Sequence, residues 1–262
     1  MSRIQRTLAL WFAFVIANPL MAQVSRVNPL EQVLGRVQAA VARGERPLVV
    51  LDLDDTLFRV SFRTRNILHD WAAAHPEAGD LHARIDALDP EKMPWSLPAT
   101  LDQVGLKDPA LRKSADRYWG VGFFSSRYLA VDETVHGAVV YVNRLARAGA
   151  RLVYLTGRDT GRMYEGTVRA LVKSGFPAPT PSGHVLMMKS DYKLNDCLFK
   201  AQACREIRAM GPVVASIDNE PRNCNMFRAE LPGATIVCVN TPHSDNSPAL
   251  EPGIGLVPDF RY

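Results

Sequence analysis

The sequence lacks the features that mark several large classes of protein. Its 262 residues contain no block of five or six Lys or Arg and no interleaving of basic with aromatic residues, which argues against a nucleic-acid-binding surface. No internal repeat or low-complexity tract stands out, and a net charge of +4 says little about partners. What remains is an ordinary globular composition, 47% hydrophobic and 22% charged, with enough apolar mass for a sizeable core.

Cysteine and histidine are scarce, and their spacing does not indicate zinc. The four cysteines form no Cys-x-x-Cys pair, and they lie at Cys197, Cys204, Cys224 and Cys238. If residues 196–210 are helical, the first two lie about 10 Å apart along the axis, too far for one disulfide. Any disulfide would have to join different elements, and four unpaired buried thiols are the alternative. None of the histidines falls in a metal-binding spacing: His69, His75, His82, His136, His184 and His243.

The sequence also has no apolar run long enough to span a membrane, which takes about 20 residues. Its N-terminal segment has two arginines, an uncharged run over residues 7–17 and a Leu-Met-Ala exit. This pattern is typical of a secretory signal peptide over residues 1–22, cleaved near Ala22, and the alternative is a membrane-anchoring helix. We therefore expect a periplasmic or secreted protein that has no stable membrane insertion after cleavage.

Helical and strand patterns alternate through most of the remaining chain. A helix that starts at Asn28 and ends at Gly44 leads into an aliphatic strand at residues 47–53, of the kind buried on both faces of a parallel sheet. Further helices are expected near residues 134–148, before Gly175, and at 196–210, with strands at 151–155, 213–217 and 235–239. The alternation predicts an α/β fold, a doubly wound parallel sheet whose ligand site lies beyond the carboxyl ends of the strands.

Between residues 58 and 130 this alternation stops. The interval contains helical pieces, prolines and aromatic residues but no aliphatic strand, and it is too long for a loop. We expect a mostly helical cap here, inserted into a core made of residues 23–57 and 131–262. Its aromatic side chains could stack on a nucleoside or sugar, although in a small helical domain they more often form the core.

Three predicted strands end in polar clusters, which should converge on one crevice. The clusters read DLDDT at residues 52–56, TGRD at 156–159 and DNEP at 218–221. Crowding Asp52, Asp54 and Asp55 at the end of an apolar strand costs electrostatic and desolvation free energy. The first cluster therefore indicates a function, the alternative being an Asp-rich turn, and Asp55 is expected to be a solvated spacer.

These clusters resemble the motifs of the haloacid dehalogenase superfamily, in its phosphatase branch and near the secreted acid phosphatases. The resemblance covers the core segments and leaves the cap unassigned. The residues that match the family's Asp-x-Asp-x-Thr, its second-strand Ser or Thr and its last acidic metal ligand are Asp52, Asp54, Thr56, Thr156 and Asp218. Because the dehalogenase branch lacks the second Asp, the presence of Asp54 favours phosphoryl chemistry.

The resemblance implies a phosphatase, a phosphoric monoester hydrolase that acts on a small phosphorylated metabolite such as a nucleotide outside the cytoplasm. Asp52 would attack phosphorus to give an aspartyl phosphate, and Asp54 would protonate the leaving oxygen and then take a proton from water. Mg²⁺ would bind Asp52, the backbone carbonyl of Asp54, and Asp218. The rival interpretations are a phosphate-binding or storage-type protein without turnover and a phosphotransferase that uses an alcohol acceptor.

The phosphate oxygens would be held by Thr156, by backbone N–H groups near it such as that of Gly157, and by a lysine. We prefer Lys200, which lies in the first turn of the helix before the last metal-bearing strand, and Lys189 is the runner-up. Thr156 could instead cap a helix, and Asp218 could combine capping with metal binding.

Two further positions leave alternatives open. Arg158 is expected at the crevice, where it could hold a substrate anion or pair with Asp159 or Glu220. Many relatives have a second acidic residue four or five places after the last metal ligand, whereas this sequence has Arg222 and Asn223 there. Asn223 can bind a metal ion or its waters through its carbonyl oxygen, but without charge.

Overall fold

The centre of the molecule is a parallel β-sheet. The computed structural model describes residues 28–262, so the predicted signal peptide lies outside the described residues. The sheet has six strands in the order β5-β4-β1-β6-β7-β8, and every neighbouring pair is parallel. The strands are β1 (Leu48–Leu51), β4 (Arg151–Asp159), β5 (Val185–Lys189), β6 (Val213–Asp218), β7 (Thr235–Val239) and β8 (Gly255–Val257). The predicted doubly wound α/β fold is confirmed.

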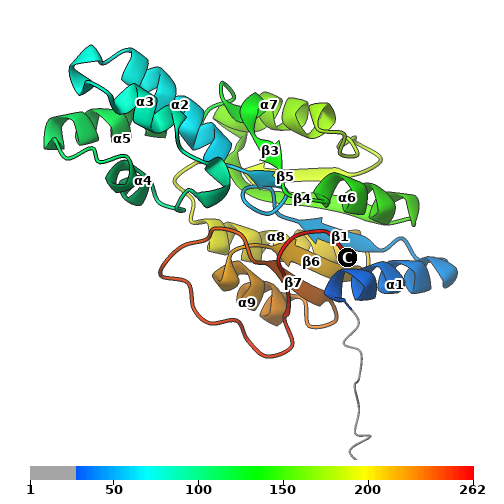
Figure 1. Cartoon of the computed structure of the whole chain (residues 1–262). Coiled ribbons are helices and arrows are strands. Elements are labelled where there is room, and N and C mark those ends of the chain that lie inside the picture. Colours follow the sequence, from blue (N-terminus) through cyan, green and yellow to red (C-terminus); the bar gives the residue numbers. More distant parts are fainter. Residues whose placement is uncertain (1–27) are drawn as a thin grey trace, which may run out of the picture.

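Helices cover both faces of this sheet (Figure 1). One face packs against α1 (Pro29–Ala42), α6 (Ala138–Arg147) and α7 (Thr160–Lys173), and the other against α8 (Asp196–Met210) and α9 (Pro221–Glu230). The strand residues divide between the two cores with a period of two: Val49 and Leu51 belong to the first, Leu48 and Val50 to the second. A strand buried on both faces needs a continuous aliphatic run, which is why residues 47–53 read as they do.

The helices begin where the sequence provides caps. Asn28 Oδ1 accepts a hydrogen bond from the backbone N of Leu30 at 2.9 Å, with Pro29 in the first turn. Asp159 and Asn195 cap α7 and α8 in the same way. Because Asp159 is the last residue of β4, this cap fixes the direction in which the chain leaves the sheet just after Thr156.

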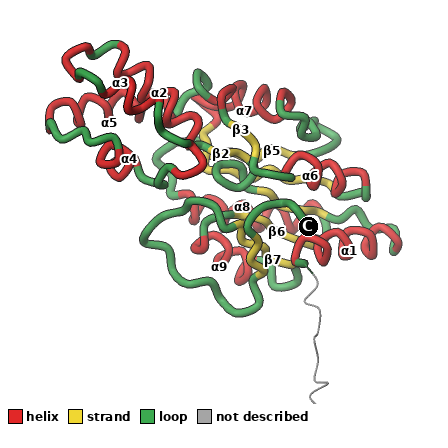
Figure 2. The backbone as a smooth tube through the Cα atoms, viewed as in Figure 1, coloured by secondary structure: helices red, strands yellow, loops and turns green. Residues whose placement is uncertain are grey.

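A helical lobe, residues 61–123, stands apart from the sheet (Figure 1). Figure 2 shows it as a group of helices joined to the strands of the sheet by loops. Its elements are α2 (Ser61–Ala73), α3 (Leu81–Asp86), α4 (Leu97–Gln103) and α5 (Pro109–Phe123), with 3-10 turns at Pro76–Ala78 and Pro90–Lys92. The lobe has a core of its own, in which Trp71 is fully buried. It lies within the interval predicted to form the cap.

The two chain segments that connect the lobe to the sheet pair with each other. Strands β2 (Phe58–Arg59) and β3 (Glu133–Thr134) form a short antiparallel ribbon, and a 3-10 turn at Leu129–Val131 precedes β3. Pairing the entering and leaving segments limits how far the lobe can move relative to the sheet.

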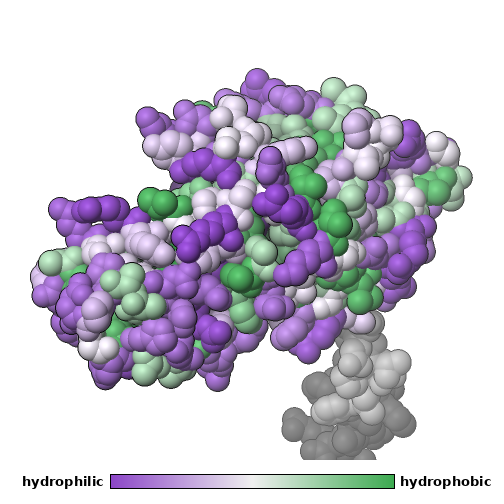
Figure 3. All heavy atoms as spheres, turned by 90° about the horizontal axis from the view of Figure 1, so that it is seen from above, coloured by the Kyte–Doolittle hydropathy of each residue, from purple (hydrophilic) through white to green (hydrophobic). Residues whose placement is uncertain are grey.

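The surface seen from above the lobe is mostly hydrophilic, with hydrophobic residues exposed singly or in small groups (Figure 3). None of the helices in residues 28–262 combines the length and the hydropathy that crossing a bilayer requires.

All four cysteines are free thiols. Two of them donate from Sγ to backbone carbonyls at the end of β6, Cys224 to Asp218 and Cys238 to Asn219, at 3.5 Å each.

His184 gives a first testable prediction, because it links β4 to the start of β5. Its Nδ1 accepts a hydrogen bond from the backbone N of Leu152 at 3.1 Å, and burial together with Arg151 lowers the pKa of the ring. The unfolded chain then binds a proton more readily than the folded one. The stability that this causes is fully present above the unfolded pKa of about 6.5 and is lost as the pH falls from there through the lower pKa of the folded state.

We therefore expect the free energy of unfolding to fall more between about pH 7.5 and about pH 5.5 in the wild type than in His184→Asn. The Asn side chain keeps an acceptor for Leu152 but does not titrate. Urea titrations of both proteins at the two pH values measure the free energies of unfolding. An equal decrease in both proteins would show that His184 does not cause the pH dependence.

Candidate active site

The polar clusters of three neighbouring strands meet in one pocket. Asp52 directly follows the central strand β1, Thr156 lies in β4 on one side of it, and Asp218 is the last residue of β6 on the other. The pocket beyond these strand ends has a volume of about 660 Å³, within the range usual for small-molecule sites. Predicted site residues that line it are Asp52, Asp54, Thr156, Gly157, Arg158, Lys200 and Asn223.

Lys200 joins the ends of β1 and β6. Its Nζ donates to Asp52 Oδ1 and to Asp218 Oδ2, both at 2.7 Å, and all three side chains are buried. Burial alone would lower the pKa of Lys200, but Asp218 and Asp52 outweigh it and raise the pKa above its usual value. The ammonium group therefore stays charged between the two carboxylates.

The runner-up, Lys189, lies in a different setting. Its Nζ donates to the backbone carbonyls of Tyr192 and Leu194 and to Asp196 Oδ1, at 3.1, 2.9 and 2.6 Å. These contacts hold the loop between β5 and α8, which lines the pocket, so Lys189 stabilises this loop and does not contact the carboxylates at the strand ends. Both lysines line the pocket, and Lys200 is the one that contacts Asp52 and Asp218.

Asp52 has a partner on each carboxylate oxygen. Besides Lys200 on Oδ1, Thr56 Oγ1 donates to Oδ2 at 2.8 Å and lies 3.2 Å from Asn219 Oδ1. Burial raises the pKa of Asp52 to about 7, against the opposing effect of Lys200. The threonine of the Asp-x-Asp-x-Thr pattern therefore fixes the orientation of Asp52, and the sequence did not indicate the contact with Asn219.

Asp54 points toward two arginines. Its Oδ1 accepts from Arg158 Nη2 at 2.6 Å and from Arg63 Nη2 at 2.9 Å. Burial would raise the pKa of Asp54, but Arg158 and then Arg63 outweigh it and hold the pKa below its usual range. The two arginines therefore favour an ionised Asp54.

The same arginines share a second carboxylate, that of Asp132. Arg63 donates to it from Nε at 2.9 Å and from Nη2, and Arg158 donates from Nη2 at 3.2 Å. The alternatives raised for Arg158, pairing with Asp159 or Glu220, are both wrong: Asp159 binds Arg162 instead, and Glu220 accepts from Ser244 and Ser247.

This four-residue cluster, Arg63, Arg158, Asp54 and Asp132, connects the lobe to the sheet. Arg63 lies in the first turn of α2, Asp132 precedes β3, and Arg158 lies in β4. Three of the side chains are almost fully buried, and their formal charges, two positive and two negative, cancel. No sequence pattern indicated Arg63 or Asp132, because both fall outside the strand-end clusters.

Asp55 is not the solvated spacer expected from the sequence. It is 5% exposed, its Oδ1 accepts from the backbone N of Val60 at 3.2 Å, and burial raises its pKa to about 8. Its φ of 53° lies in the left-handed region, which Asp tolerates better than most residues. Asp55 therefore shapes the turn that follows Asp52.

The donor atoms near Asp218 fit a hard cation such as Mg²⁺. The carboxylates of Asp52 and Asp218 and the backbone carbonyl of Asp54 are oxygen ligands of the kind Mg²⁺ prefers. Asn223 donates from Nδ2 to both Asp218 oxygens at 3.2 Å each, so it orients that carboxylate in place of the second acid found in many relatives. In residues 28–262 the side chains of Asp52, Asp54 and Asp218 do not converge as a three-carboxylate cluster, so the Asp54 contribution would come from its backbone.

Aromatic side chains of the lobe, and of Phe124 directly after it, line part of the pocket. Trp119 packs against Phe123 with ring centroids 4.5 Å apart, and both line the pocket together with Trp95 and Phe124. Trp71 belongs to the lobe core and Trp119 packs against that core as well as lining the pocket, whereas Trp95, Phe123 and Phe124 line the pocket outside the core.

Comparison with known proteins supports the fold. No family model and no curated protein matches the chain. A solved structure from Clostridium difficile, assigned as a phosphatase, is similar over 78% of this chain and 89% of its own, with 13% identity and a TM-score of 0.50. A structure from Haemophilus somnus, assigned as a phosphoglycolate phosphatase, has 12% identity, coverages of 82% and 95%, and a TM-score of 0.49. CbbY from Rhodobacter sphaeroides in complex with phosphate has 14% identity, coverages of 82% and 95%, and a TM-score of 0.47.

At 13% identity a TM-score of 0.50 shows a shared fold and no more, and the two lower scores add nothing to it. The α/β fold that the resemblance to haloacid dehalogenase superfamily phosphatases implies is thereby confirmed. These structures do not distinguish the secreted acid phosphatase branch from others.

The predicted periplasmic or secreted location is wrong by the same comparison. The similar structures are mostly those of cytoplasmic phosphatases, and residues 1–22, on which the prediction depended, lie outside the described residues. The expectation of a substrate met outside the cytoplasm is withdrawn with it.

Proposed function

We propose that this protein is a Mg²⁺-dependent phosphomonoester hydrolase that works through an aspartyl phosphate on Asp52. The observation that carries the proposal is the buried Asp52–Lys200–Asp218 arrangement, with both Nζ–O distances at 2.7 Å, in which Asp52 and Lys200 line a ligand-sized pocket and Asp218 lies behind them. A structural ion pair needs one carboxylate, whereas here two acids and a lysine are buried together at the ends of two strands. The phosphatase assignments of proteins with a similar fold agree with this chemistry.

In the first displacement an Asp52 oxygen forms a bond to phosphorus while the bond from phosphorus to the ester oxygen breaks. Lys200, held next to Asp52, counters the charge on the phosphoryl oxygens, and Thr156 with the backbone N–H of Gly157 holds them from the β4 side. Bound Mg²⁺, held by Asp52, Asp218 and the backbone carbonyl of Asp54, would supply further charge neutralisation.

Asp54 serves as the acid and base of the reaction. Ionised by its two arginines, it is suited to take the proton from the water that attacks the aspartyl phosphate in the second displacement. To protonate the leaving oxygen in the first displacement, Asp54 first has to take up a proton from solvent, which requires that it release part of its contact with Arg63, a residue of the lobe. The position of the lobe would then influence the protonation of Asp54.

The substrate is a small phosphomonoester, since a pocket of about 660 Å³, lined in part by aromatic side chains of the lobe, has room for a small molecule.

We expect release of inorganic phosphate from p-nitrophenyl phosphate with added Mg²⁺, and we expect a chelator to abolish this release. Phosphate binding without release would favour a storage-type protein of the same fold. Formation of glycerol phosphate when glycerol is added would show transfer to an alcohol. A panel of phosphomonoesters then defines the substrate.

The choice between the two lysines gives a second prediction. We expect Lys200→Met to lower kcat by about 10²- to 10³-fold, the usual effect of removing one preorganised donor to a developing charge. Lys189→Met removes a charge of the same sign from the wall of the pocket and should change kcat much less, with circular dichroism confirming that both variants fold. A larger loss in Lys189→Met would make Lys189 the phosphate-binding lysine.

A further inference from the structure

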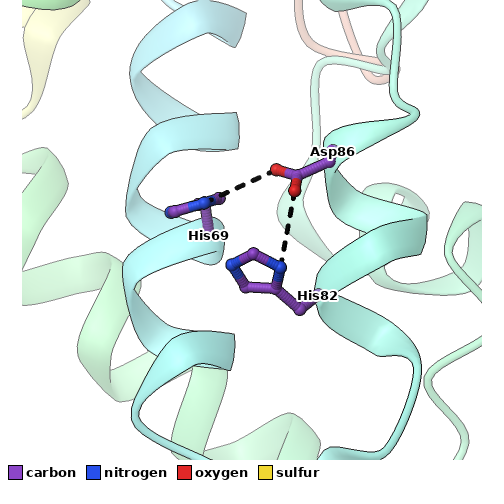
Figure 4. A group of neighbouring side chains, drawn as sticks. All are labelled: His69, His82 and Asp86. Atoms are coloured by element: carbon purple, nitrogen blue, oxygen red, sulfur yellow. Dashed lines mark ion pairs between the residues drawn. The ribbon is translucent and has the colours of Figure 1, made fainter.

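Three side chains that the proposed reaction does not use meet on the outer side of the lobe. His69 comes from α2, and His82 and Asp86 come from α3 (Figure 4). His69 Nε2 lies 3.6 Å from Asp86 Oδ1, and His82 Nδ1 lies 3.4 Å from Asp86 Oδ2. One ligand atom from each residue falls within 4.8 Å of the others, and no other trio of His, Cys, Asp or Glu does so in the part of the chain that the structure describes.

The packing of α2 against α3 brings these three side chains together. His82 and Asp86 are four residues apart on one helix, so their side chains share a face. His69 faces them from α2, which is fixed against α3 through the buried side chains of Leu68, Leu81 and Ile85. The two imidazole rings have centroids 4.3 Å apart. Neither ring needs a backbone movement to reach a shared ion.

An outer carboxylate orients the first histidine. His69 Nδ1 lies 3.5 Å from Asp70 Oδ1, while Asp70 Oδ2 accepts a hydrogen bond from the Tyr128 hydroxyl at 2.7 Å. A carboxylate on one ring nitrogen fixes the tautomer and leaves the other nitrogen, here Nε2, as the metal ligand. Nε2 is the nitrogen that faces Asp86.

We propose that His69, His82 and Asp86 form a binding site for a first-row transition ion, of which Zn²⁺ is the test case. Two imidazoles and one carboxylate suit Zn²⁺, Ni²⁺ or Cu²⁺, whereas Mg²⁺ prefers oxygen ligands alone. Ligand bonds of about 2.0–2.2 Å draw the three atoms closer than they lie here, which side-chain rotations can provide at a partly exposed site. Solvent supplies the fourth ligand, and the bound ion clamps α2 to α3.

This metal site lies in the lobe whose aromatic side chains line the pocket, but metal binding at the site does not require catalysis in the pocket. The sequence did not reveal it, because His82 and Asp86 supply only two ligands and the third comes from another helix. The statement that no histidine falls in a metal-binding spacing is therefore incomplete: the spacing from His82 to Asp86 places two ligands on one helical face.

Calorimetric titration of the full chain with Zn²⁺ tests the site, with excess Mg²⁺ present to compete at the oxygen ligands near Asp52. We expect His82→Ala and Asp86→Asn to weaken Zn²⁺ binding by more than the roughly tenfold that loss of an outer partner costs, and Asp70→Asn by about tenfold. The controls Asp116→Asn and His136→Ala, exposed residues of the same types away from the trio, should bind as the wild type does.

Thermal unfolding gives a second readout that does not involve activity. Because Zn²⁺ binds the folded chain, it should raise the midpoint of unfolding in the wild type and in both controls, and raise it less or not at all in the trio variants. Indistinguishable Zn²⁺ isotherms for wild type, His82→Ala and Asp86→Asn would overturn the proposal, as would the absence of Zn²⁺ binding to the wild type. Neither outcome bears on phosphatase activity, which is measured separately with Mg²⁺.

Discussion

Asp52→Asn should lower kcat for p-nitrophenyl phosphate by about 10⁴-fold or more, the scale on which loss of a catalytic nucleophile acts. An amide oxygen is a poor nucleophile toward phosphorus, so the aspartyl phosphate does not form and the two-step route is lost. The substitution preserves the shape of the side chain and an acceptor for Thr56 Oγ1, which donates to Asp52 Oδ2 at 2.8 Å, but it removes the acceptor for Lys200 Nζ. The loss therefore reports chemistry more than packing.

Asp55→Asn is the matched control for this experiment. Asp55 lies three residues away in the same turn, lines the same pocket and is equally buried, and Asn tolerates its left-handed φ of 53°. We expect this variant to keep activity of the same order as the wild type. Phosphate release measured side by side with Mg²⁺ separates the two aspartates. Equal activity in Asp52→Asn and Asp55→Asn would end the assignment of Asp52 as the nucleophile.

The sequence predicted the framework of the site because that framework is local. An aliphatic run such as residues 48–51 is typical of a strand that is buried on both faces. The first polar residue after it is then expected at the carboxyl end of the strand, where Asp52 is found. The same reasoning placed Thr156 and Asp218, since the carboxyl ends of parallel strands share one edge. Lys200 was preferred as a first-turn residue of its helix; it is the fifth residue of α8, just past the first turn, and it lies between the ends of β1 and β6.

What the sequence did not predict depends on contacts between distant segments. Arg63 and Asp132 are 69 positions apart and meet only because β2 pairs with β3. Arg158 and Arg63 also pair with Asp54 and hold its pKa below the usual range. No local pattern encodes such a contact, since a charged residue on an amphipathic helix is usually solvated.

Asp132→Asn should destabilise the fold by about 3–5 kcal/mol, the usual cost of removing one partner from a buried ion pair. Asp132 is fully buried and accepts hydrogen bonds from both Arg63 and Arg158, so its loss leaves two buried guanidinium groups with Asp54 as their one remaining anion in the cluster. Urea titration at neutral pH measures the change. Glu133→Gln removes the same charge from the next residue, which is exposed on β3, and should change stability by less than about 0.5 kcal/mol.

A double-mutant cycle separates loss of charge balance from loss of packing. Adding Arg63→Met to Asp132→Asn restores equal numbers of positive and negative charges, leaving Arg158 paired with Asp54 at 2.6 Å. The double variant should therefore lose less stability than the sum of the two single variants, by about 0.5–3 kcal/mol, because the two residues belong to one hydrogen-bonded network. Strict additivity would mean that Arg63 and Asp132 stabilise the fold independently. In that case any influence of the lobe on the protonation of Asp54 would depend on the direct contact of Arg63 Nη2 with Asp54 Oδ1, at 2.9 Å, and not on the pair of Arg63 with Asp132.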